Sequence, residues 1–119
     1  MEPQFDYRKY AILYVDDEEK SLKGFSRAFG DDFRIYTATN AKDGAKLIAE
    51  KKDEIAVLMT DQKMPGESGN WLLQETVRIQ PRIIRILATA FTDFKDAVTA
   101  INDGGIFHYV NKPWDPAHL

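Results

Sequence analysis

The four consecutive acids "DDEE" at residues 16–19 directly follow the apolar run 10–15, and a further acid, Asp61, directly follows the apolar run 55–60. Carboxylates grouped at strand ends repel one another, by about 4 kcal/mol for unit charges about 4 Å apart at an effective dielectric near 20. A positive partner must therefore compensate them. A cluster of oxygen ligands without His or Cys best suits a hard divalent cation. The sequence predicts a Mg²⁺ site, in preference to Ca²⁺ or Zn²⁺.

Phosphoryl transfer is the reaction class that this set of residues favours. Protein-bound Mg²⁺ usually combines one or two carboxylates with water and phosphate oxygens. Asp61 stands alone in its loop and is the candidate nucleophile, which would form an acyl phosphate. Lys112 and the metal would offset charge on the phosphoryl oxygens, while the hydroxyl of Thr89 donates a hydrogen bond.

Five short apolar runs rich in β-branched and aromatic residues are the candidate strands. They span residues 10–15, 33–38, 55–60, 83–88 and 106–110. Segments with helical spacing lie between them, and Asn40 with Asp43 resembles a capping box. Thr92 is expected to cap a fourth helix, and a fifth begins at Asp115. The alternation predicts an α/β fold, a doubly wound (βα)5 sandwich with a parallel sheet covered on both faces.

This topology gathers the chemically important residues. In open parallel sheets, ligands bind beyond the carboxyl ends of the strands, where the strand order reverses. The residues that follow strands one, three, four and five would therefore face one crevice. They are Asp16, Asp17, Asp61, Thr89 and Lys112.

Composition limits the alternatives. A chain of 119 residues fits one domain, and its lack of cysteine excludes disulfides and thiolate metal sites. A net charge of -3 gives no electrostatic footprint for nucleic acid, so no direct nucleic acid binding is expected. Without an apolar run of about 18 residues or a secretory leader, we expect a cytoplasmic chain that does not enter a membrane.

These residues and their spacing resemble the receiver domain of two-component response regulators over essentially the whole chain. The resemblance implies a flavodoxin-like sandwich with a five-stranded parallel sheet of order 2-1-3-4-5. Asp61, in "DQKMPGESG", resembles the phosphoacceptor and also contacts the metal. By the same resemblance, Asp17 is a direct Mg²⁺ ligand and Asp16 a ligand through water, and Lys63 contributes its backbone carbonyl.

The same resemblance assigns roles near the ends of the last two strands. Thr89, Ala90 and Lys112 would contact the phosphoryl group, and Thr89 and Tyr109 would form a switch pair. In that pair the hydroxyl moves toward the phosphoryl group and the aromatic ring turns inward. Lys112-Pro113 is similar to the cis peptide of this family, a bond that is seldom cis elsewhere.

The "KPWD" at residues 112–115 resembles a subgroup whose receivers often precede enhancer-binding activators, cyclic-di-GMP phosphodiesterases or histidine kinase modules. Residues 1–9 form a polar lead-in and residues 10–119 the receiver domain, expected to be the N-terminal part of a longer protein. The fifth helix would be truncated, and one expected consequence is an exposed apolar strip near Ile12, Tyr14 and Trp114.

The expected partners are a sensor histidine kinase or a phosphotransfer protein, and an attached C-terminal output domain. A homodimer is also compatible with the resemblance. In phosphorelay signalling of this kind, the chain would be a phosphoprotein rather than an enzyme. It would carry out only its own Mg²⁺-dependent phosphorylation and dephosphorylation.

Two alternatives stand beside this interpretation. A Mg²⁺-dependent aspartyl phosphatase of the haloacid dehalogenase type uses two aspartates one residue apart after its first strand. Here Asp16 and Glu18 have that spacing, but the second aspartate is missing. A pseudo-receiver that only binds partners usually lacks one of the acids or the lysine, and none is missing here.

Overall fold

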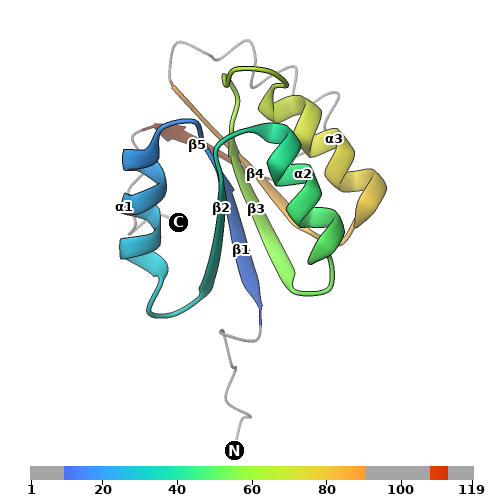
Figure 1. The fold of residues 1–119 in the computed structure, drawn as a ribbon, viewed down its shortest axis with the longest axis horizontal. Helices are drawn as coiled ribbons and strands as arrows, with labels where there is room; N and C mark the ends of the chain where they lie inside the picture. Colours follow the sequence, from blue (N-terminus) through green and yellow to red (C-terminus); the bar gives the residue numbers. More distant parts are fainter. Residues whose placement is uncertain (1–9, 91–107, 113–119) are drawn as a thin grey trace, which may run out of the picture.

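The structure is a computed structural model that describes residues 10–90 and 108–112, with side-chain detail for residues 10–88. Strands and helices alternate along this part of the chain (Figure 1). The strands are β1 (Ala11–Val15), β2 (Arg34–Ala38), β3 (Ile55–Asp61), β4 (Ile84–Ala90) and β5 (His108–Lys112). The helices are α1 (Glu19–Phe29), α2 (Ala41–Glu50) and α3 (Gly69–Ile79).

All neighbouring strands pair in parallel. Strands β1 to β4 have the order β2-β1-β3-β4, as predicted, and β5 pairs with β4 at the edge of the sheet. Helix α1 covers one face of the sheet, whereas α2 and α3 lie together on the other (Figure 1). The described residues therefore form the flavodoxin-like arrangement of a doubly wound parallel sheet. Pairing of β1 with β2 and β3 places the end of β1 at the reversal of strand order, where such folds bind ligands.

Strand β1 is apolar throughout because both of its faces are covered. Leu13 and Val15 belong to the core cluster that includes side chains of α2 and α3. Tyr14 belongs to the cluster on the α1 face, with Phe25. The predicted exposed strip is therefore wrong for Tyr14, which is fully buried because α1 packs over it. Ile12 is partly buried, and Trp114 lies outside the described residues.

Local hydrogen bonds explain where the helices begin. The side chain of Asn40 accepts the backbone N–H of Asp43 and caps α2, as the capping-box pattern predicts. Ser68 caps α3 in the same way by accepting the N–H of Trp71. The helices predicted to start after Thr92 and at Asp115 lie outside the described residues. Among the described helices, none has the length and apolar character needed to span a bilayer.

Candidate metal and phosphoryl-transfer site

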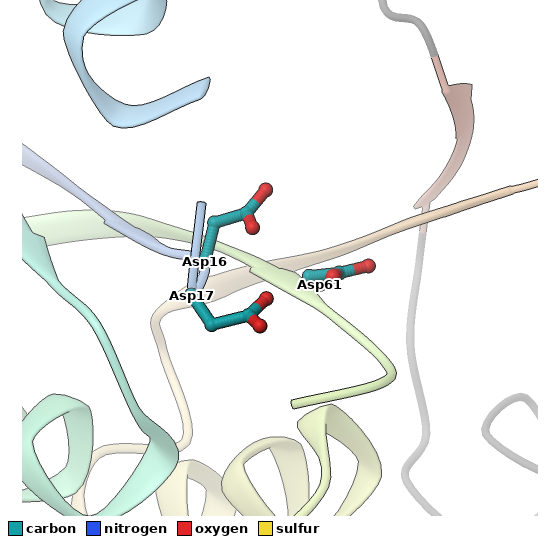
Figure 2. Close-up of side chains that lie close together, drawn as sticks. All are labelled: Asp16, Asp17 and Asp61. Carbon is teal, nitrogen blue, oxygen red and sulfur yellow. The ribbon is translucent and has the colours of Figure 1, made fainter. Parts of the chain in front are cut away.

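Three carboxylates meet at the carboxyl ends of β1 and β3. Asp16 and Asp17 follow β1, and Asp61 is the last residue of β3. Val15 pairs with Thr60, so the next residue of each strand, Asp16 or Asp61, arrives at the same edge. One carboxylate oxygen from each acid lies within 4.8 Å of the others. Figure 2 shows the three side chains pointing to the same side of the strand ends.

The three acids differ in burial. Asp16 is fully buried and Asp61 is 9% exposed, whereas Asp17 is exposed. Two of the carboxylates are therefore buried, and the third is open to solvent. A cation can reach the cluster from the solvent side, next to Asp17. Its donors are all oxygens, the ligand type that Mg²⁺ prefers, and their mutual repulsion favours a bound cation. The chemistry and spacing of this donor set therefore fit Mg²⁺.

Two hydrogen bonds hold the buried carboxylate of Asp16. Its Oδ2 accepts the hydroxyl of Tyr14 at 2.7 Å, and its Oδ1 accepts the backbone N–H of Glu18 at 3.0 Å. The contact with Tyr14 was not among the predictions from the sequence. The available signal was the two-residue spacing, because residues i and i+2 of a strand lie on the same face.

Gln62 closes the loop that carries the candidate phosphoacceptor, a role that the sequence analysis also missed. Its backbone N–H donates to Oδ1 of Asp61 at 3.0 Å, and its backbone carbonyl accepts the N–H of Gly69 at 2.9 Å. The side-chain carbonyl of Gln62 accepts the N–H of Asn70 at 2.8 Å, in the first turn of α3. Lys63 is exposed in this loop, two residues after Asp61.

The backbone brings the remaining predicted residues to the same edge of the sheet. Asp61 pairs with Ala88, which directly precedes Thr89, and Thr89 pairs with Asn111. Ala90 and Lys112 are paired as the last residues of β4 and β5. Tyr109 lies further back on β5, opposite Leu87. The side chains of Thr89, Tyr109 and Lys112 and the peptide bond to Pro113 lie outside the described detail.

The described residues thus form a flavodoxin-like, doubly wound parallel sheet with a cluster of oxygen ligands at the ends of β1 and β3. Residues 12–119 match the family described as "Response regulator receiver domain", and the chain belongs to this family. Receiver domains bind Mg²⁺ at an acidic pocket, which here corresponds to the carboxylates of Asp16, Asp17 and Asp61. The dehalogenase-type alternative is not favoured, because Asp17 rather than Glu18 completes the cluster.

Known proteins with a similar sequence include a much longer regulator. The hydrogenase transcriptional regulatory protein HoxA of Cupriavidus necator is 34% identical over 112 residues. That match covers 94% of this chain but only 23% of HoxA. The chain therefore spans about a quarter of the length of this relative.

Solved receiver domains have the same fold. A receiver domain protein from Clostridium thermocellum is 31% identical, with a TM-score of 0.84, covering 91% of this chain and 86% of that one. The signal receiver domain of an HD domain-containing protein from Pseudomonas fluorescens Pf-5 is 30% identical, with a TM-score of 0.86. The second match covers 94% of this chain and 89% of that one.

Proposed function

We propose that this chain is a phosphoacceptor in two-component signalling, with Asp61 accepting a phosphoryl group in the presence of Mg²⁺. The donor is the phosphohistidine of a sensor histidine kinase or of a phosphotransfer protein. The observation that carries the proposal is the grouping of Asp16, Asp17 and Asp61 within 4.8 Å, at the end of β3. The ends of β4 and β5 lie alongside and bring the backbones of Thr89 and Lys112 to the same edge.

The transfer itself is a substitution at phosphorus. A carboxylate oxygen of Asp61 forms the new O–P bond while the P–N bond to the donor imidazole breaks, and the imidazole leaves with its electron pair. Asp17 would bind Mg²⁺ directly, Asp16 through water, and Lys63 through its backbone carbonyl. When bound, Mg²⁺ would supply positive charge next to the phosphoryl oxygens.

The ends of β4 and β5 would receive the transferred group. The Thr89 hydroxyl and the Ala90 backbone would donate hydrogen bonds to the phosphoryl oxygens, and Lys112 would provide a positive charge. A cis peptide between Lys112 and Pro113 would aim that side chain. Movement of Thr89 toward the phosphoryl group and of the Tyr109 ring inward would then change the surface around β5.

The changed surface would regulate an attached output in a longer cytoplasmic protein, of which residues 10–119 are the N-terminal receiver. One relative is a transcriptional regulatory protein, and one solved neighbour comes from an HD domain-containing protein. These two names support the view that similar receiver domains are attached to different output domains. The receiver would catalyse only its own phosphorylation and dephosphorylation.

Acetyl phosphate with Mg²⁺ tests the assignment without a cognate kinase. The expected result is one phosphoryl group per chain, located at Asp61 by peptide mass spectrometry and lost on treatment with hydroxylamine. Asp61→Asn should not be labelled. Asp53→Asn, which changes an exposed aspartate in the turn before β3, is the matched control and should be labelled normally. Undiminished labelling of Asp61→Asn at another residue would contradict the proposal.

A further inference from the structure

Tyr14 and Asp16 form a buried pair beneath the metal site. The phenol oxygen of Tyr14 lies 2.7 Å from Oδ2 of Asp16, and both residues are fully buried. Hydrogen bonds from a hydroxyl to a carboxylate are short and about twice as strong as neutral ones. Because Glu18 donates its backbone N–H to Oδ1, each oxygen of Asp16 already has a protein donor.

Packing on the α1 face of the sheet fixes the ring of Tyr14. Its centroid lies 4.8 Å from that of Phe25 at an interplanar angle of 51°. Phe25 packs in turn on Phe29, also at 4.8 Å, with an angle of 46°. Both phenylalanines belong to α1, which covers this face of the sheet (Figure 1). The ring therefore cannot swing away from Asp16 without displacing the packed helix.

We propose that Tyr14 is a positioning residue of the metal site, which fixes the carboxylate of Asp16 and thereby favours Mg²⁺ over Ca²⁺. This inference rests on the Mg²⁺ site of the proposed function. Outer partners of metal ligands orient them, and their loss typically weakens metal binding 10- to 100-fold. A carboxylate oxygen has two lone-pair sites, so Asp16 can still bind the metal or its water while Tyr14 donates to it.

The selectivity follows from the different geometric demands of the two cations. Mg²⁺ requires nearly ideal octahedral coordination at short distances, whereas Ca²⁺ accepts irregular arrangements with six to eight oxygens. Two hydrogen bonds fix the orientation of the Asp16 carboxylate. A fixed orientation suits the strict geometry of Mg²⁺, whereas Ca²⁺ gains less from it because Ca²⁺ tolerates several orientations. Releasing Asp16 should therefore weaken Mg²⁺ binding more than Ca²⁺ binding.

Tyr14→Phe tests the proposal, because it removes the hydroxyl and keeps the packed ring. The dissociation constants of Mg²⁺ and Ca²⁺ are measured by calorimetric titration of the whole chain. We expect Mg²⁺ to bind roughly tenfold more weakly to the variant, and Ca²⁺ to change by less than about threefold.

Tyr36→Phe is the matched control. Tyr36 also donates its hydroxyl to a carboxylate, Oε1 of Glu54 at 3.2 Å, but Glu54 directly precedes β3, at the opposite end of that strand from Asp61. This variant also loses a hydrogen bond from a tyrosine hydroxyl to a carboxylate, although a longer and less buried one, so an effect of losing any such bond should appear in both variants. We expect its affinities for both cations to equal those of the unchanged chain.

A second measurement on the unchanged chain keeps the inference testable if Tyr14→Phe folds poorly. With tyrosines labelled at the ζ carbon, Mg²⁺ should shift the NMR signal of Tyr14 and leave that of Tyr36 in place. Equal Mg²⁺ affinity of Tyr14→Phe and the unchanged chain, equal losses for both cations, or a Tyr14 signal insensitive to saturating Mg²⁺ would overturn the inference. An unchanged chain that binds no Mg²⁺ would instead overturn the metal site of the proposed function, and this inference with it.

Discussion

Gly69, the first residue of α3, lies so close to the backbone carbonyl of Asp61 that a β-carbon at position 69 would overlap its oxygen. The N–H of Gly69 donates to the carbonyl of the next residue, Gln62, at 2.9 Å. Helix α3 therefore starts in direct contact with the backbone of the candidate phosphoacceptor. Only a residue without a side chain permits this approach.

Gly69→Ala should consequently destabilise the fold and disturb the site together. Overpacking of this kind typically costs about 1–3 kcal/mol, and because the obstacle is backbone, the loop of Asp61 must move. We expect lower stability in urea denaturation and weaker Mg²⁺ binding. Gly24→Ala is the control, since a β-carbon in the middle of α1 would meet no atom within 4 Å. That change should stabilise the chain by about 0.5–1 kcal/mol. Equal effects of the two substitutions would contradict this account.

The sequence predicted the order of β1 to β4 and the acidic cluster because both depend on simple geometric rules, although β4 ends at Ala90 and β5 at Lys112, each two residues beyond the predicted end. Continuous apolar runs such as that of β1 indicate strands buried on both faces, and parallel strands end at a common edge. Asp16 and Asp61 had to meet once their strands were recognised as neighbours. The cap at Asn40 was predictable too, because its partner Asp43 is only three residues away.

The supporting contacts could not be predicted, because they depend on packing between distant segments. The hydroxyl of Tyr14 reaches Asp16 only because the aromatic rings of α1 fix its direction. Gln62 accepts the N–H of Asn70 in the first turn of α3 only because Gly69 lets the loop close. The two-residue spacing places Tyr14 and Asp16 on one face but does not show that the hydroxyl reaches the carboxylate, and the contact of Gln62 with Asn70 has no spacing rule. The sequence therefore predicted an exposed strip at Tyr14, which is instead fully buried.

The cap of α2 gives a prediction of local stability. Asn40→Ala removes the acceptor of the Asp43 N–H and should cost about 1 kcal/mol, the usual value for loss of a helix N-cap. Asn40→Asp keeps the acceptor but loses the hydrogen bond that the Asn40 amide donates to Oδ2 of Asp43 at 2.9 Å, so it should retain part of the stability. Urea denaturation with far-UV circular dichroism measures both. If the alanine and aspartate variants were equally destabilised, the side-chain cap would not be the cause.

The ion pair between Arg34 and Glu54, the residue before β3, predicts a pH dependence of stability. The hydrogen bond from Arg34 to Glu54, at 2.7 Å, lowers the pKa of Glu54, and the Tyr36 hydroxyl acts in the same direction. A pKa depressed in the folded state gives stability that is fully present above the unfolded pKa and is lost as pH falls through the folded pKa. Glu54→Gln should therefore destabilise the chain at neutral pH, and the difference should shrink in acid.

Thermal melts between neutral pH and about pH 3, below the ordinary range of glutamate, measure this difference. Glu50→Gln, which also removes one exposed carboxylate but at the last residue of α2, is the control and should not lose stability at neutral pH, because a negative charge is unfavourable at a helix C-terminus. A constant gap between Glu54→Gln and the unchanged chain across the whole range would show that the ion pair is not its source.

Asp17 offers the sharpest test of the metal site, because it is the exposed member of the cluster. Asp17→Asn removes one of three mutually repelling charges, so in the absence of metal the variant should be at least as stable as the unchanged chain. The same change removes a predicted direct ligand, so Mg²⁺ should no longer raise the melting temperature.

For the unchanged chain, Mg²⁺ at ten times its dissociation constant should add about 1.4 kcal/mol of stability, a shift of a few degrees. Asp53→Asn also removes one negative charge from an exposed aspartate, but in the turn before β3, away from the cluster. It should keep the full shift, because general screening of negative charge does not depend on the cluster. Both variants lose one negative charge, but only Asp17→Asn should lose the Mg²⁺-induced shift of the melting temperature. This difference would distinguish binding at the acidic site from a nonspecific salt effect. A Mg²⁺-induced shift that survives in Asp17→Asn would remove Asp17 from the ligand set.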